Sequence, residues 1–184
     1  MTCIVGIADQ ESGKVWMGAD SLGTTENGCA SIINSYKKIF RIGDLLIGCA
    51  GSPTPGQRMR YMLKVPEYEH IFEDEQENIS CYIVSKLVDA IKECIDAAKL
   101  KDDDKGYFLV GFKGRLFGIY PDDYQVDEDS CGYNAIGSSA HVALGSLWTS
   151  AGMGIATEDR VRLALRASAE LNVYVRPPFQ IESI

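Results

Sequence analysis

Short apolar runs separated by turn residues dominate the pattern of the chain. Each run is rich in β-branched or aromatic side chains, and the segments that join paired runs contain glycine. This arrangement is typical of antiparallel hairpins. The pattern predicts three of them, which pair residues 2–8 with 14–19, 38–42 with 45–50, and 107–112 with 115–120.

Helical periodicity is clearest in the middle of the chain, where Ile83, Leu87, Ile91 and Ile95 recur on one face of a helix that we expect at 79–100. Thr157 begins a sequence typical of a helix cap. Shorter helices are predicted at 55–63, 137–150 and 157–171. The other segments are predicted to be a loop or irregular strand at 21–35, an acidic turn at 121–130, a strand at 133–136 and final strand material at 173–184.

The order of these elements indicates the fold class. Hairpins dominate and no strand–helix–strand crossover repeats, which disfavours a Rossmann-type fold. We expect an α+β protein built as a four-layer αββα sandwich, with two antiparallel sheets between helical layers. No linker, internal repeat or low-complexity segment divides the sequence, so residues 1–184 are expected to form a single domain.

Composition narrows the range of partners. The chain has 184 residues, of which 46% are hydrophobic and 24% are charged, as in an ordinary globular protein. A net charge of −8 argues against nucleic acid or an anionic membrane as the main partner. We find no apolar stretch of membrane-spanning length and no signal-peptide pattern. A cytoplasmic location is expected.

The cysteines and acidic clusters predict no metal site and no cofactor. The six cysteines are scattered, form no C-x-x-C motif and do not pair with His70 or His141, so we expect reduced thiols. Acidic runs at 102–104 and 127–129 lack the spaced ligands of a calcium loop. Cys3 is expected in the core, because strand alternation turns it away from Thr2.

Three residues near the start of the sequence have the chemistry of a self-activated nucleophile. The Thr2 hydroxyl needs an adjacent base, and a free α-amino group on the same residue, with a pKa of roughly 7.7 to 8.0, is suited to that role. A lysine ammonium would keep this amine unprotonated, and an aspartate would hold the lysine. Lys38 and Asp20 are the candidates. Thr2 becomes terminal only when Met1 is removed.

These motifs resemble those of the proteasome β-subunit family, and especially of its bacterial relatives, the HslV peptidase and the Anbu group. The resemblance covers nearly the whole chain and is sharpest in residues 2–51. It implies an N-terminal nucleophile (Ntn) hydrolase fold. Thr2 falls on the family's nucleophile, Asp20 on the aspartate that ends the second strand, and Lys38 on the second lysine of its Lys-Lys-Val motif.

Further site residues follow from the same resemblance. Gly51 falls where the family donates a backbone N–H to the oxyanion, and Ser138 falls on its accessory serine. Read alone, Gly51 is equally typical of a turn and Ser138 of a helix cap. Substrate-binding positions are implied at Thr24, Tyr36, Phe40 and Cys49. Because these side chains carry no charge, we expect an apolar residue before the cut.

The accessory network departs from the family pattern. The family's accessory aspartate falls at Glu170, a longer carboxylate, and the serine expected next to it is replaced by Val173. The second glycine of the usual Gly-Ser-Gly motif is Ser139. These changes weaken the accessory site and leave Thr2, Asp20 and Lys38 intact.

The resemblance implies a threonine peptidase that acts on peptides or unfolded proteins without a cofactor. It also implies a homo-oligomer, as a ring or a spiral, with an ATP-dependent unfoldase as a further partner. Two alternatives to the peptidase remain open. In the first, the chain is a catalytically silent structural or interaction subunit, which retention of Met1 would favour. In the second, it is an amidase of the same fold that acts on small amides.

Overall fold

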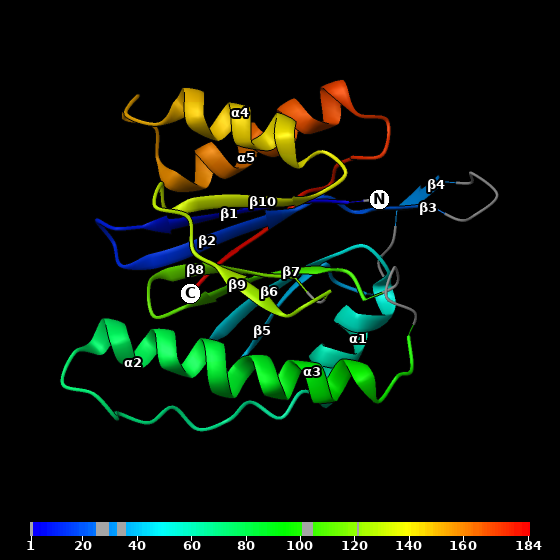
Figure 1. Cartoon of the computed structure of the whole chain (residues 1–184). Helices are drawn as coiled ribbons and strands as arrows, with labels where there is room; N and C mark the ends of the chain where they lie inside the picture. The colour runs from blue at the N-terminus through cyan, green and yellow to red at the C-terminus, as the bar shows by residue number, and fades with distance from the viewer. Residues whose placement is uncertain (1, 25–29, 33–35, 101–104, 121) are drawn as a thin grey trace.

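The computed structural model describes residues 2–24, 30–32, 36–100, 105–120 and 122–184. They form two stacked antiparallel sheets with helices on the outer side of each (Figure 1). The predicted four-layer αββα sandwich is confirmed.

The sheet drawn at the top of Figure 1 has the strand order β10-β1-β2-β11. Strand β1 is buried on both faces, because helices cover one face and the second sheet covers the other. This burial explains its continuous apolar sequence. The strands are β1 (Cys3–Asp9), β2 (Lys14–Ala19), β10 (Tyr133–Gly137) and β11 (Gln180–Ser183).

The second sheet contains the other two predicted hairpins and one strand that was not predicted. Its strands follow one another in sequence order, as β5 (Ile39–Ile42), β6 (Leu45–Ala50), β7 (Tyr107–Phe112), β8 (Arg115–Tyr120) and β9 (Gln125–Asp127). Strand β9 lies inside the predicted acidic turn. In the segment 21–35, which was predicted to be a loop or an irregular strand, β3 (Leu22–Thr24) and β4 (Ala30–Ile32) pair with each other.

The helices fall into two layers. α4 (Ala140–Ser150) and α5 (Thr157–Leu171) cover the first sheet (Figure 1). The second sheet is covered by α1 (Pro53–Met62) and by a continuous helix made of α2 (Glu75–Cys81), the π-helical η1 (Tyr82–Leu87) and α3 (Val88–Asp96).

Several predicted boundaries need correction, among them the end of the long helix, which lies at Asp96 and not at residue 100. The long helix begins earlier than residue 79, because the Asp74 side chain accepts a hydrogen bond from the Gln76 N–H and caps a polar first turn. The predicted cap at Thr157 is wrong. The N-cap residue is Ala156, and the Thr157 hydroxyl instead donates to Asp9 Oδ2 at 3.1 Å. Final strand material is confined to β11.

Candidate active site

Thr2, Asp20 and Lys38 converge from separate elements at one end of the sandwich. Thr2 lies immediately before β1, Asp20 immediately after β2, and Lys38 immediately before β5 of the other sheet. The register that places Ile4 opposite Ala19 brings Thr2 and Asp20 to the same end of the paired strands β1 and β2. All three are buried, with exposed fractions of 4% for Thr2, 2% for Asp20 and 6% for Lys38.

The carboxylate of Asp20 organises this cluster. Lys38 Nζ donates to Asp20 Oδ1 at 2.8 Å, and the Cys3 and Leu22 backbone N–H groups donate to the carboxylate at 3.0 Å each. Lys38 Nζ also donates to the Leu22 carbonyl oxygen at 2.8 Å. A buried ion pair is retained at low cost only when further hydrogen bonds satisfy its polar atoms. This pair meets that condition, and it fixes Lys38 beside the residue that follows Thr2.

Burial changes the acid–base behaviour of Lys38. Desolvation lowers the pKa of its ammonium, while the charge of Asp20 and the hydrogen bond to it act in the opposite direction. Two of the three N–H donors of this ammonium are used by Asp20 and Leu22. Lys38 also lines a small hollow together with Thr2. A cation with a lowered pKa is therefore held next to the candidate nucleophile.

Two glycines carry the backbone past Thr2 in conformations that other residues rarely adopt. Gly51 has a φ of +104°, and a Cβ there would lie 2.9 Å from the Gly106 Cα. Gly137 has a φ of +100°, and a Cβ there would lie 2.1 Å from the Thr2 carbonyl oxygen. Sequence reasoning found Gly51 and missed Gly137, although a glycine at a strand end is a signal of close backbone approach.

The Ser138 side chain contacts the backbone of Thr2, the candidate nucleophile. Its hydroxyl donates to the Thr2 carbonyl oxygen at 3.4 Å, and Asn172 Nδ2 donates to the Ser138 carbonyl oxygen at 3.4 Å. The N-cap residue of α4 is Ser139, without a side-chain capping bond. The alternative interpretation of Ser138 as a helix cap is therefore wrong, and Asn172 is a neighbour of the site that sequence reasoning missed.

Cys3 is a core residue, as predicted. Its side chain is fully buried, and its Sγ donates to the Ser168 Oγ at 3.4 Å. The pKa of the thiol is raised to about 11, mainly because burial disfavours the thiolate. Ser168 in turn donates to the Ser139 carbonyl oxygen at 3.5 Å. These contacts tie β1, α5 and the start of α4 together, and they leave Thr2 as the candidate nucleophile.

Glu170 lies away from this cluster. It is exposed and lines the outer groove between α4 and α5, together with Ser146 and Arg166. The inward face of α5 is instead formed by Val161, Leu165 and Ser168. The structure therefore does not bring the predicted accessory carboxylate to Thr2, and the residues of this region that contact the 138–139 turn are Ser168 and Asn172.

Two hollows meet at Thr2, and both are also lined by Gly51. The smaller one, of about 10 Å³, is lined by Tyr36 and Cys49, as predicted for the substrate-binding side, and by Lys38. Burial raises the pKa values of the Tyr36 hydroxyl and the Cys49 thiol, so both stay neutral near pH 7. The larger cleft, of about 490 Å³, was not predicted.

Of the other two predicted substrate positions, Phe40 lines neither hollow. Phe40 is 3% exposed and packs in the core between the second sheet and its helices. Its neighbour Ile39 faces the other sheet, so strand alternation turns Phe40 toward the helices. The Thr24 backbone ends β3, and its side chain lies outside the described part of the structure.

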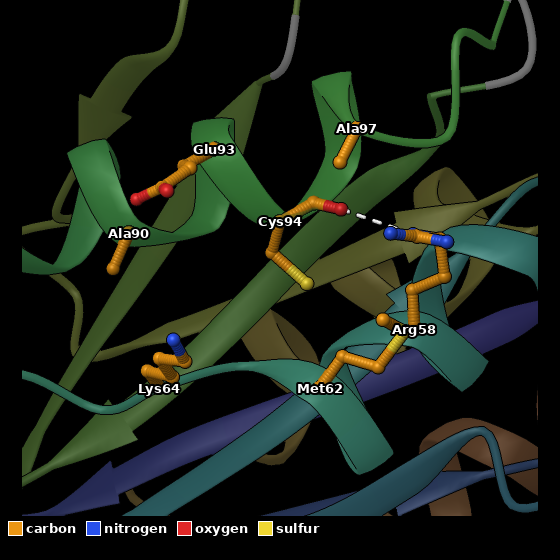
Figure 2. A pocket seen from close by; sticks show the side chains of 7 residues that line it. All are labelled: Arg58, Met62, Lys64, Ala90, Glu93, Cys94 and Ala97. Carbon is orange, nitrogen blue, oxygen red and sulfur yellow. Dashed lines mark hydrogen bonds between the residues drawn. The ribbon is translucent and has the colours of Figure 1, made fainter.

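A separate hollow of about 180 Å³ lies between α1 and α3 (Figure 2). Arg58 Nε donates there to the Cys94 carbonyl oxygen at 3.0 Å, and Lys64 and Glu93 line its rim. Burial raises the pKa of the Cys94 thiol, so this cysteine is not a poised nucleophile. The hollow shares no lining residue with the two at Thr2.

Within the described ranges, no three His, Cys, Asp or Glu side chains are grouped so as to hold a metal ion. The acidic run at 102–104, which lacks the ligand spacing of a calcium loop, lies outside the described residues.

None of the helices in the described part of the chain combines the length and apolarity that crossing a membrane requires.

Comparison with protein-family models finds no match for this sequence, and comparison with curated proteins finds none either. Solved structures do match. The bacterial proteasome homologue BPH from Thiobacillus denitrificans, in complex with epoxomicin, superimposes with a TM-score of 0.75 at 23% identity, over 100% of this chain and 98% of that one.

Two further structures extend this likeness. HslV from Trypanosoma brucei has a TM-score of 0.71 at 20% identity, over 99% of this chain and 98% of that one. Anbu from Yersinia bercovieri has a TM-score of 0.70 at 17% identity, over 100% of this chain and 81% of that one. The predicted resemblance is therefore confirmed at the level of the fold, which is that of the proteasome-like Ntn hydrolases.

Proposed function

We propose that this chain is a threonine peptidase that cleaves peptide bonds with Thr2, after removal of Met1. The observation that carries the proposal is the buried Lys38–Asp20 ion pair beside Thr2, with Nζ and Oδ1 2.8 Å apart. A cation and a carboxylate are expensive to bury, and groups with a perturbed pKa, such as the Lys38 ammonium, cluster at functional sites. The fold shared with proteasome-like proteins supports the same conclusion.

In the proposed reaction the Thr2 amine takes the hydroxyl proton as Oγ attacks the substrate carbonyl carbon. The resulting oxyanion accepts a hydrogen bond from the Gly51 N–H. The intermediate collapses when the amine returns the proton to the leaving nitrogen, which breaks the peptide bond and leaves an ester on Thr2. Attack by water on this ester, with the amine again as base, releases the acid product and restores Thr2.

Lys38 and Asp20 would tune this cycle without entering it covalently. The positive charge of Lys38 disfavours protonation of a nearby amine and so keeps the base available near neutral pH. Asp20 holds Lys38 in place and, through the Cys3 N–H, also holds the peptide group that follows Thr2. No cofactor is required by this mechanism.

Self-association as a ring or spiral, an ATP-dependent unfoldase partner and a cytoplasmic location belong to the same proposal. A compartment of this kind would restrict the enzyme to peptides and unfolded chains. An inactive site would instead make the chain a structural subunit, and turnover limited to small amides would make it an amidase.

The test is intact-protein mass spectrometry with epoxomicin, the compound in complex with the Thiobacillus denitrificans protein. We expect loss of the Met1 mass and one covalent adduct on the purified chain. Thr2→Ala should form no adduct. Thr149→Ala is the matched control, because this exposed α4 threonine donates to the Gly145 carbonyl oxygen within its own helix and lines neither hollow at Thr2. Retained Met1 with no adduct would favour the silent-subunit alternative.

A further inference from the structure

The larger cleft at Thr2 is an opening of the space between the two sheets. Besides Thr2 and Gly51, it is lined mainly by Tyr107, Tyr120 and residues 135–138, which are the end of β10 and the residue after it. We call it the tyrosine cleft. Its volume of about 490 Å³ contrasts with about 10 Å³ for the small hollow on the Lys38 side.

The sheet register explains why the two tyrosines meet there. Phe108 pairs with Ile119 across β7 and β8, and both side chains are fully buried in the core on the helix side. Because successive residues of a strand point to opposite faces, the next positions outward, Tyr107 and Tyr120, point toward the first sheet. Their rings pack edge to face, with centroids 6.0 Å apart and an interplanar angle of 69°.

The chemistry of this lining is apolar and aromatic. Among the described residues that line it, none is an acid, a lysine or an arginine. A charged side chain bound there would lose water without gaining a counter-charge, whereas an aromatic ring would gain both burial and edge-to-face contact. Tyr107 is 43% exposed, so part of this aromatic surface is open to a ligand.

A peptide that is cut at Thr2 must extend in both directions from the scissile bond. The two hollows share Thr2 and Gly51, so each can receive the part of the peptide on one side of the scissile bond. Tyr36 and Cys49, which are expected to contact the residue before the cut, line the small hollow. The tyrosine cleft is therefore left for the residue after the cut, next to the Ser138 hydroxyl.

We propose that the tyrosine cleft selects a large apolar side chain, above all an aromatic one, at the residue that follows the cut. The small hollow admits only a small uncharged side chain before the cut. This inference rests on the proposed function and gives it a substrate class, namely peptides with a small residue followed by an aromatic residue.

The experiment measures kcat/KM by liquid chromatography and mass spectrometry on peptides that differ only after the cut. Alanine precedes the cut, and phenylalanine, alanine, lysine or glutamate follows it. We expect about a tenfold preference for phenylalanine over alanine, as for a filled apolar pocket, and the slowest cleavage with the charged residues. Tyr107→Ala and Tyr120→Ala should bring the phenylalanine-to-alanine ratio near one, and Tyr107→Phe should retain it.

Tyr61→Ala is the matched control, because Tyr61 is 72% exposed on α1 and does not line the tyrosine cleft. It should leave the ratio unchanged. If the wild-type chain forms the epoxomicin adduct but cleaves all four peptides equally, the cleft is not a selective subsite. If the tyrosine variants change selectivity before the cut instead, the assignment of sides is wrong. Absence of both adduct and cleavage would overturn the proposed function itself.

Discussion

Removal of the Lys38 side chain should destabilise the fold, because it leaves the buried Asp20 carboxylate without its counter-charge. Asp20 is 2% exposed, and Lys38 supplies its only counter-charge among the ion pairs of the described residues. Breaking a buried ion pair from one side costs about 3 to 5 kcal/mol. Two backbone N–H donors remain on the carboxylate, so we expect the lower end, about 3 kcal/mol for Lys38→Met.

The assay is thermal and urea unfolding of Lys38→Met, Asp20→Asn and the double variant. For a chain of 184 residues, a loss of about 3 kcal/mol corresponds to a fall in Tm of about 6 to 12 °C. The double variant removes both charges and should lose only about 1 to 2 kcal/mol, because an amide nitrogen at the Oδ2 position leaves the Leu22 N–H without an acceptor.

Lys37→Met is the matched control for this experiment. The Lys37 side chain is 54% exposed and pairs with Glu182 at 3.4 Å, so its loss should cost less than about 1 kcal/mol. If Lys37→Met and Lys38→Met lower the urea midpoint equally, or if the double variant is less stable than Lys38→Met, Asp20 does not depend on Lys38 as argued.

Two further predictions concern Gly137 and Tyr82. Gly137→Ala should destabilise the fold by at least about 1 kcal/mol and reduce epoxomicin labelling, because its Cβ would lie 2.1 Å from the Thr2 carbonyl oxygen at a φ of +100°. Gly145→Ala on α4 is the control, because a Cβ there would meet nothing within 4 Å. Equal effects of the two substitutions on the urea midpoint would contradict this prediction. Burial raises the pKa of the Tyr82 hydroxyl to about 12 from its usual value near 10. Its folded-state pKa lies above its unfolded value, so the stability it contributes is present below pH 10 and lost as the pH rises toward 12. In urea unfolding between pH 9 and 12, Tyr82→Phe should therefore lose less stability with rising pH than the wild-type chain does, and parallel curves would refute this.

Local sequence signals were sufficient for the parts of the fold that depend on neighbours in the chain. The hairpins follow from apolar runs around Gly43 and Gly114, and the buried face of the long helix follows from the spacing of Ile83, Leu87 and Ile91. Strand β9 was missed, and β3 and β4 were predicted only as part of a loop or irregular strand, because each of the three has only three residues and is too short for a period to show.

The site was predicted only where family motifs stand in for tertiary information. Thr2, Asp20 and Lys38 meet as the resemblance implied, whereas spacing alone could not bring β5 to β1. Phe40 and Glu170 failed for a local reason. Phe40 is out of phase with Ile39 on its strand, and Glu170 is two residues beyond Ser168, on the far side of a helix.

Neither a local sequence pattern nor the family resemblance indicates Asn172 or Tyr120. Asn172 reaches the Ser138 carbonyl from beyond the end of α5, a contact that depends on how α4 and α5 pack. Tyr120 lines the same cleft as Thr2 only because the two sheets are stacked in one particular offset. Such contacts join residues more than thirty positions apart and are set by the assembled core.

The hydrogen bond from the Cys3 N–H to Asp20 has a consequence for how the protein matures. It holds the main chain one peptide after Thr2, at a point that excision of Met1 does not touch. On the proposed function, this bond would hold the backbone of the site in the same way before and after the excision, so activation would require cleavage of one peptide bond and no rearrangement of the Cys3–Asp20 contact.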